Sequence, residues 1–377
     1  MTLGSVLLLI LGLILFVALV VVHEFGHFWA ARRSGVEVEE FGIGFPPRAW
    51  SRKTKGGFLF SLNWLPIGGF VKLKGEHDSD TEKGSFGAAS LSGKVKIMLA
   101  GVGMNLLAAF VLLTILAWVG MPHILENQFT VKSDTKTLRH DVLIGYIEKG
   151  SPAAKAGLQL RDQLISMRVG NQTKVVDTAH SLPVITHEWA GQKVTLTYKH
   201  KGQQKQTAVQ LLSVEAVEAS KKTAHPKGYL GLSPTEYTMT RSTWSAPVVA
   251  GGLIKQFTVA TFKGLGTAVG ALFQGQGHKA SEQVSGPIGI IVLLKDGSLL
   301  GVQFVLMIIA IISLTLAIMN VLPIPALDGG RLFVTLLARV LGRPISQEAE
   351  ERIYGYGFAA LMILVVMVTI VDVKRFF

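Results

Sequence analysis

The sequence contains no cysteine among its 377 residues. This absence excludes disulfide bonds, cysteine-ligated zinc and a thiol nucleophile. Histidine and carboxylate side chains remain as the ligands from which a catalytic metal site can be built.

Charged residues are also scarce. They make up 16% of the chain, against 49% hydrophobic residues, and the mean hydropathy is +0.43. This composition is typical of membrane proteins rather than soluble enzymes. The formal net charge is +12, but the basic residues are scattered through loops instead of following one element. Attraction to anionic lipid head groups therefore explains the charge more simply than nucleic-acid binding does.

Long apolar segments are abundant, and each is long enough to span a bilayer. The first of them lacks a basic start and a clear small-x-small cleavage site, so we interpret it as a retained transmembrane helix rather than a signal peptide. The sequence thus predicts four spans, at about residues 3–31, 95–119, 299–319 and 356–373.

A His-Glu-Phe-Gly-His motif at residues 23–27 follows an uncharged run over residues 2–22. His23 and His27 are four residues apart on one helix face, where they can bind one metal ion, and Glu24 can act as a general base towards water. Ionisable groups inside a span cost roughly 2.5–3.5 kcal/mol each and usually mark function. The alternative, in which the two imidazoles only hydrogen-bond to neighbouring helices, leaves Glu24 without a purpose.

A catalytic zinc site needs a third protein ligand and an open position for water. The best candidate is Asp328, in the segment 320–330 directly after the third span. Pro323 and Pro325 break the helix there, and a carboxylate follows in apolar surroundings. Asp328 can alternatively cap a helix that begins near Gly329, since aspartate is a preferred N-cap.

Other acidic residues are weaker candidates for the third ligand. Asp372 lies at the extreme terminus and Asp296 precedes its span. A hydrophilic loop holds Glu76, Asp78, Asp80 and Glu82. A rival class of membrane-embedded zinc protease takes a glutamate from a downstream helix, and the candidates for it lie in a polar linker: Glu348, Glu350 and Glu351.

The loop after the first span is unusually apolar. Residues 41–47 and 58–70 interleave aromatic and aliphatic side chains with glycine, which predicts hairpins. Such backbone is tolerated at membrane depth only where protein covers it or it lines a cavity. A surface hairpin of a cytoplasmic loop is the alternative.

Residues 254–273 show helical spacing, which fits either an amphipathic helix on the membrane surface or a helix packed on the soluble module described next.

Residues 127–212 form the polar stretch of the chain. Residues 142–147 and 194–198 have strand character, residues 150–152 predict a turn, and residues 153–158 suit a short helix. The pattern indicates a small soluble α/β module inserted into a membrane protein.

Charge distribution predicts the orientation. The loop over residues 32–96 carries eleven Lys or Arg, and no basic residue precedes the first span. The positive-inside rule therefore places this loop in the cytoplasm, and the amino terminus and the soluble module outside. Lys374 and Arg375 argue mildly against this orientation.

Taken together, the motifs at 23–27 and 320–330, the intervening module and the Ser-Gly-Pro-Ile-Gly sequence at 285–289 resemble the site-2 protease family of intramembrane zinc metalloproteases. The resemblance covers nearly the whole chain. Within this family, the chain resembles more specifically the bacterial, regulator-of-sigma-E-protease-like branch, which processes anti-sigma factors and remnant signal peptides.

This resemblance implies a set of functional residues. It implies zinc bound by His23, His27 and Asp328, with Glu24 activating the water and Asn320 positioning substrate. The apolar loop resembles the membrane-reentrant hairpins of the family, which receive the substrate. The resemblance therefore implies substrate binding by four residues of this loop: Phe60, Leu62, Gly68 and Gly69. The implied substrates are single-span membrane proteins, and the implied location is the bacterial cytoplasmic (inner) membrane, with the active site near its cytoplasmic side.

The soluble module resembles a PDZ domain. Residues 144–147 match its groove strand and residues 150–158 the turn that follows. Arg161-Asp162 stands where that family often has Gly-Asp, and one module is present where bacterial relatives often have two. We therefore expect a size filter that admits substrates already trimmed outside the membrane.

We expect a polytopic α-helical membrane protein with four transmembrane helices, a membrane-associated β-hairpin region and one inserted PDZ-like α/β domain. The alternative is a catalytically inactive membrane scaffold that binds partners through the PDZ-like domain, against which the intact motif residues argue. The expected parts are a first membrane part with two spans and the reentrant hairpin loop (1–120), a PDZ-like extracytoplasmic domain (121–235), an amphipathic helix and loop (236–298), and a second membrane part with two spans (299–377).

Overall fold

The computed structural model describes residues 2–221, 226–342 and 345–377. The chain forms two compact units. The first comprises residues 1–121, 127–134 and 242–377, and the second comprises residues 122–126 and 135–241. The boundary expected at residue 235 falls within a strand of the second unit.

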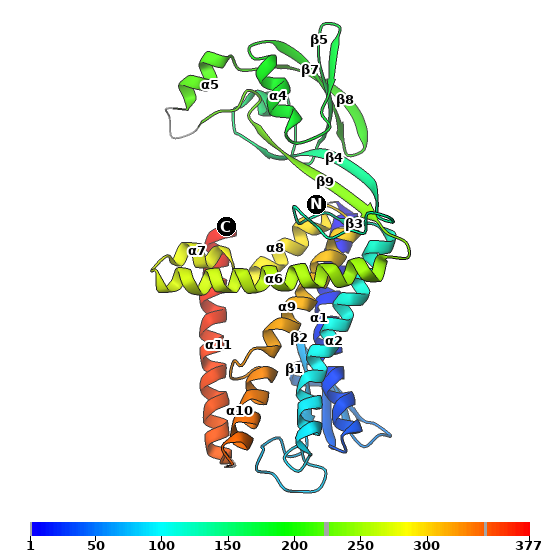
Figure 1. The fold of residues 1–377 in the computed structure, drawn as a ribbon, viewed down its shortest axis with the longest axis vertical. Helices are drawn as coiled ribbons and strands as arrows, with labels where there is room; N and C mark the ends of the chain where they lie inside the picture. Colours follow the sequence, from blue (N-terminus) through cyan, green and yellow to red (C-terminus); the bar gives the residue numbers. More distant parts are fainter. Residues whose placement is uncertain (1, 222–225, 343–344) are drawn as a thin grey trace. The chain divides into compact units, whose positions relative to one another are not determined.

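Long helices dominate the first unit (Figure 1). Among the described residues, four helices are long and apolar enough to cross a membrane: α1 (Leu3–Arg33), α2 (Leu91–Val119), α9 (Val302–Val321) and α11 (Gln347–Phe376). The four predicted spans are confirmed at this level. Three of these helices begin at a residue whose hydroxyl accepts a backbone N–H of the first turn, namely Thr2, Ser90 and Ser346.

The fourth span differs from its prediction in length. It starts at Gln347 instead of residue 356, because the Ser346 cap and acidic residues in the first turn stabilise a polar helix start. The glutamates expected in a polar linker therefore lie in the first turns of α11.

Helix packing in the first unit centres on α2, which lies between α1 and α9. A short helix, α8 (Pro287–Ser298), packs against α1, α9 and α11. The apolar cluster at this junction contains Leu19, Leu294, Val305 and Ile309. After α9 the chain turns into α10 (Asp328–Val340). A further short helix of this unit is α7 (Gly277–Glu282).

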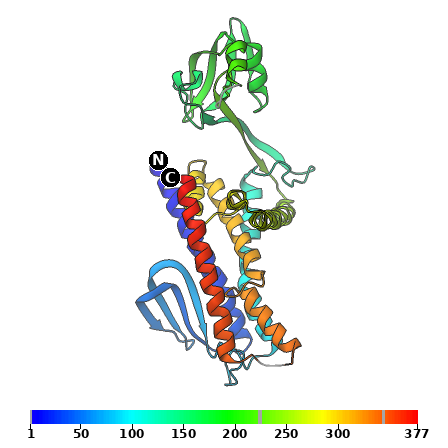
Figure 2. The ribbon, with the colours of Figure 1, turned by 90° about the vertical axis from the view of Figure 1, so that its left-hand side faces the viewer.

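Two long strands, β1 (Val38–Lys53) and β2 (Leu59–Leu73), form the hairpin region and lie beside α1 (Figure 2). Residues 40–43 of β1 pair on one side with residues 69–72 of β2 and on the other side with residues 59–62. Residues 59–63 pair in addition with residues 48–53. Each strand therefore contributes two segments, here called rungs, to one ribbon, whose outer rungs are residues 48–53 and 69–73.

The helix α6 (Ala246–Phe273) runs across the spans rather than along them (Figures 1 and 2). Its buried residues pack on α2 and α9, and Val259, Phe262 and Leu272 are exposed. Asp134 accepts hydrogen bonds from Ser245 and Thr243 at the start of this helix, and these bonds lower the pKa of its carboxyl well below the ordinary value.

The second unit is a twisted antiparallel sheet with short helices. Its strands are β4 (Lys136–Ile147), β5 (Gln163–Val169), β6 (Gln172–Val175), β7 (Lys193–His200), β8 (Gln203–Gln210) and β9 (Leu232–Arg241). They are ordered β9-β4-β5-β7-β8, with β6 on β5. The short β3 (Met121–Pro122) lies where the chain passes between the units. The helices are α3 (Pro152–Lys155), α4 (Ser181–Glu188) and α5 (Val214–Ser220).

The segments expected as strands at 142–147 and 194–198 lie in β4 and β7. The short helix expected at 153–158 is present only over Pro152–Lys155, as α3, and the chain turns at Ala156. The strand β4 has neighbours on both sides, β9 and β5. Residues 144–147, which match the groove strand of a PDZ domain in sequence, pair with residues 232–234 of β9. This part of β4 is therefore hydrogen-bonded within the unit and offers no free edge towards β9.

Candidate metal centre

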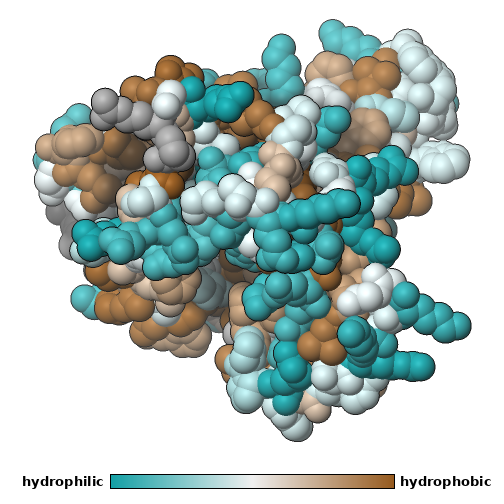
Figure 3. Space-filling view, turned by 90° about the horizontal axis from the view of Figure 1, so that it is seen from below, coloured by the Kyte–Doolittle hydropathy of each residue, from teal (hydrophilic) through white to brown (hydrophobic). Residues whose placement is uncertain are grey.

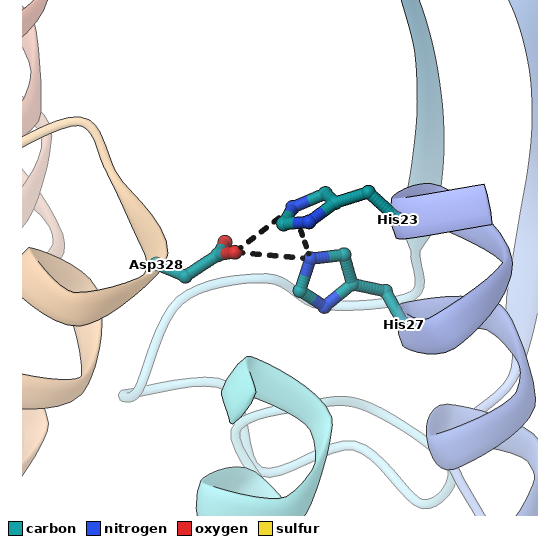
Figure 4. A group of neighbouring side chains, drawn as sticks. All are labelled: His23, His27 and Asp328. Atoms are coloured by element: carbon teal, nitrogen blue, oxygen red, sulfur yellow. Dashed lines mark hydrogen bonds and ion pairs between the residues drawn. The ribbon is translucent and has the colours of Figure 1, made fainter. Parts of the chain in front are cut away.

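The two motif histidines lie on one face of α1, as their spacing predicts (Figure 4). His23 is 8% exposed, and the two imidazole rings meet edge to face with centroids 4.7 Å apart. Their Nε2 atoms are 3.1 Å apart. The helix therefore presents two ring nitrogens to one small volume near its carboxyl-terminal end.

The chain returns to these histidines after α9. Two prolines follow the end of that helix, Ala326 takes a positive φ of 79°, and Leu327 is extended. The turn is so tight that a Cβ on Gly330 would lie 2.0 Å from the Ile324 carbonyl oxygen, so only glycine fits there. Asp328 becomes the first residue of α10. The helix N-cap is Leu327, without a side-chain cap, so the alternative in which Asp328 serves as the cap is wrong.

Asp328 Oδ2 lies 3.1 Å from Nε2 of His23 and 3.1 Å from Nε2 of His27. These three atoms form a nearly equilateral triangle (Figure 4). Protein nitrogen and oxygen ligands about 2.0–2.1 Å from a tetrahedral zinc are about 3.3 Å from one another. The three side chains are thus spaced like the ligands of one zinc ion.

A second observation supports the fit to a metal. Asp328 Oδ2 is buried and accepts no well-aligned hydrogen bond from the described residues, although two ring nitrogens lie beside it. A buried carboxylate oxygen without a partner is costly, and a bound cation would remove that cost. The cluster is the one group of three metal-ligating side chains found among the described residues.

The helix α2 supports the histidines from behind. His27 Nδ1 lies 2.8 Å from the carbonyl oxygen of Ile97, to which it can only donate, so that Nε2 keeps its lone pair. Gly101 allows the helices to approach, because a Cβ there would lie 2.5 Å from His27 Nε2 and 2.6 Å from His23 Cε1. Asn105, which is 1% exposed, places its amide Nδ2 3.3 Å from His23 Nδ1.

Glu24 lines a cavity of about 150 Å³ together with His27 and Asp328. Val71 and Leu73 of the outer rung 69–73 line the same cavity. The Glu24 carboxylate interacts with the backbone of Val71 as well as with the three candidate ligands. The general base expected from the motif is therefore positioned between the metal cluster and one edge of the β1–β2 ribbon.

The expected substrate-contacting residues are distributed unevenly. A Cβ at Gly69 would lie 3.5 Å from Glu24 Cγ, so this part of β2 passes the Glu24 side chain, and Gly68 next to it is buried. Phe60 instead packs on the rings of Phe41 and Trp50, and Leu62 is 39% exposed. Asn320 lies in the last turn of α9, half-buried.

The rival acidic ligands have other partners. Glu350 is 2% exposed and accepts the backbone N–H of Asp78 at 3.1 Å. Asp372 is 1% exposed and accepts the backbone N–H of Gly289 at 2.8 Å, at the start of α8. These carboxylates connect α11 to its surroundings instead of contributing to the cluster.

Sequence reasoning did not single out the contributions of α2. The carbonyl of Ile97 and the small volume of Gly101 leave no sequence signal that points to α1. Asn105 does leave a signal, since it is a polar side chain inside a predicted span, where such residues usually have a specific partner.

Comparison with known proteins agrees with the geometry. Residues 11–364 match the model of peptidase family M50. A protein of Clostridium acetobutylicum named as a zinc metalloprotease is 31% identical over 97% of both chains. A protein of Enterococcus faecalis named as the protease Eep is 27% identical over 97% of this chain and 98% of that protein, and one of Fusobacterium nucleatum named as a zinc metalloprotease is 28% identical over 97% of both. The chain therefore belongs to peptidase family M50, the site-2 protease family, and is a zinc metalloendopeptidase of the membrane.

Proposed function

We propose that this protein hydrolyses peptide bonds in or near the transmembrane segments of single-span membrane proteins, in regulated intramembrane proteolysis of anti-sigma-factor or remnant signal-peptide type substrates. His23, His27 and Asp328 bind the zinc, and Glu24 is the general base. The observation that carries the proposal is the triangle of ligand atoms, 3.1 Å on each side, at the end of a membrane-spanning helix.

The bound zinc supplies Lewis-acid activation of a water molecule and of the scissile carbonyl. Glu24 takes the proton of the attacking water and returns it to the leaving amine. Its place in the cavity beside His27 and Asp328 puts its carboxylate within the same small space as the candidate ligands. No covalent acyl-enzyme is needed for this sequence of steps.

A substrate helix must unwind before it is cut, since its carbonyls are engaged in internal hydrogen bonds. The outer rung 69–73 can replace the hydrogen bonds that the unwound substrate loses, because it forms an edge of the ribbon and passes Glu24 at Gly69. An unwound segment that pairs with this edge regains backbone hydrogen bonds by strand addition. In this proposal Gly68 and Gly69 lie along the substrate path, Phe60 and Leu62 support the ribbon, and Asn320 positions the bound segment.

Substrate unwinding makes a prediction about sequence preference. Glycine or proline near the cut site lowers the cost of leaving the helix by about 1 kcal/mol or more per residue. We therefore expect a model substrate with a Gly-Pro pair near the cut to be cleaved at least several-fold faster than its all-leucine counterpart. Equal rates for the two substrates in detergent would contradict the unwinding step.

The second unit supports the proposal of a PDZ-like size filter, because it is an independent compact unit with its own apolar core. The proposed location is the bacterial inner membrane, with this unit outside. The end of the molecule that is lowest in Figure 1 presents many hydrophilic side chains (Figure 3), as expected for a face in contact with water.

The function is tested by exchanging the catalytic carboxylate. We expect Glu24→Gln to retain zinc and to lose cleavage of a membrane-protein substrate by at least about 100-fold, since general-base catalysis typically contributes about 10²–10⁴-fold. His23→Ala and Asp328→Ala are expected to lose both zinc and cleavage. Full activity in Glu24→Gln would reject its role as the general base, whereas a wild-type protein that binds zinc but cleaves no membrane-protein substrate would favour the inactive-scaffold alternative.

A further inference from the structure

Asn105 is a buried amide with an unusual pair of neighbours. It lies on α2, is 1% exposed, and its Nδ2 atom is 3.3 Å from His23 Nδ1. Its Oδ1 atom is buried and has no hydrogen-bond partner among the described residues. A buried amide oxygen without a partner costs about 1–3 kcal/mol, so the arrangement calls for a physical reason.

Metal binding through Nε2 determines the state of the other ring nitrogen. An imidazole that offers the Nε2 lone pair carries its proton on Nδ1, and that N–H needs an acceptor. His27 meets this condition with the carbonyl of Ile97 at 2.8 Å. The neighbour of His23 Nδ1 must likewise be an acceptor, whereas an amide NH₂ is a donor.

A half-turn of the Asn105 amide resolves both conflicts. The oxygen and nitrogen of an asparagine amide have nearly the same shape, and their placement follows from the hydrogen bonds they make. With the two atoms exchanged, Oδ1 faces His23 Nδ1 and accepts its proton. The oxygen then has a partner, and the imidazole is held in the tautomer that binds metal.

We propose that Asn105 is a positioning residue for the metal site, whose amide oxygen accepts the Nδ1 hydrogen of His23. The inference rests on the proposed role of His23 as a zinc ligand. Ser313 of α9 stabilises the backbone at Asn105, since its buried hydroxyl donates to the backbone carbonyl of Asn105 at 2.8 Å. Together with Ile97, Asn105 makes α2 the helix that orients both histidine ligands of α1.

Zinc affinity, measured by competition with a chromogenic chelator on the purified full-length protein, tests the inference without relying on proteolysis. We expect Asn105→Leu, which has a similar volume and no acceptor, to weaken zinc binding by about 10–100-fold, as is typical for loss of such a hydrogen bond. Asn105→Asp keeps an acceptor and loses the donor, so it should bind zinc within a few-fold of the wild type. Wild-type affinity in Asn105→Leu, or equal weakening in both variants, would overturn the proposal.

Controls separate this result from general damage and from failure of the proposed function. Thr114 lies on the same helix, and its hydroxyl donates to the carbonyl of Phe110 in its own turn. Thr114→Val removes this hydroxyl, so zinc affinity should not change. His23→Ala should abolish binding, and retention of zinc in that variant would instead reject the ligand assignment.

A measurement on the wild type avoids the question of whether a variant folds. In ¹⁵N spectra of the zinc-loaded, histidine-labelled protein, two zinc-bound imidazoles should each have a protonated Nδ1. An unprotonated Nδ1 on His23 would contradict the role of Asn105.

Discussion

At the residue scale, the centre depends on side chains that three separate helices bring together. The spacing of His23 and His27 predicts that they share a helix face, and the structure agrees. The apolar surroundings of Asp328 and the prolines before it predict the third ligand, but its approach to 3.1 Å from both ring nitrogens depends on the turn between α9 and α10. Contacts that depend on the distance between helices, such as that of Gly101, are not encoded in any local pattern.

Gly101 gives a sharp test of helix approach. A methyl group at this position would lie 2.5 Å from His27 Nε2, closer than real side chains come. We expect Gly101→Ala to push α2 from the histidines and to reduce zinc affinity by at least about 10-fold, comparable to the loss of a supporting contact of a metal ligand. The metal content and affinity of the purified variant measure this effect.

The same helix provides the matched control. A Cβ at Gly103 meets no atom within 4 Å, so Gly103→Ala should bind zinc like the wild type. If the two alanine variants behave alike, the close contact at Gly101 is not what positions the ligands.

At the element scale, the spans follow from length and hydropathy, and their ends follow from capping. The sequence places the fourth span at 356–373, whereas α11 extends from Gln347 to Phe376, because polar residues at both of its ends have partners within the fold. Glu350 binds the backbone of Asp78 near one end, and Asp372 binds Gly289 near the other. The pairing order of the β1–β2 ribbon cannot be predicted from the sequence either, because each strand contributes two rungs that pair with different segments.

Asp372 is expected to anchor α11 to α8. Its carboxylate accepts the Gly289 N–H at 2.8 Å in a buried site, and removing it leaves that donor without a partner. We expect Asp372→Ala to destabilise the folded protein by about 1–3 kcal/mol. Thermal unfolding in detergent, compared with Asp296→Ala at an exposed position of α8, measures the difference. Equal midpoints for both variants would contradict an anchoring role.

At the scale of the whole molecule, the predicted orientation places the loop over residues 32–96 in the cytoplasm and the second unit outside. The absence of cysteine makes this directly measurable, because one introduced cysteine is the only thiol in the chain. Lys55→Cys lies in the turn between β1 and β2, and Asn171→Cys in the turn between β5 and β6, both at exposed positions.

We expect a membrane-impermeant maleimide to label Asn171→Cys in intact spheroplasts and to label Lys55→Cys only after the membrane is opened. The reverse pattern would place the amino terminus in the cytoplasm and would show that Lys374 and Arg375 govern the topology.

The second unit leads to an expectation about substrate choice. If it acts as a size filter, replacing residues 135–241 by a short flexible linker should allow cleavage of substrates that still carry their external domain. Comparing the cleavage of intact and trimmed substrates measures this selectivity. The same preference for trimmed substrates after the deletion would argue against the filter.

The proposed mechanism depends on one zinc ion bound jointly by α1 and α10. X-ray absorption at the zinc edge of the purified protein, combined with the zinc content of Asp328→Ala, tests this claim most directly. We expect about one zinc per chain, with two imidazoles and oxygen ligands at about 2.0–2.2 Å, and loss of the metal in the variant. Wild-type zinc content in Asp328→Ala, or a spectrum without two imidazole ligands, would contradict it.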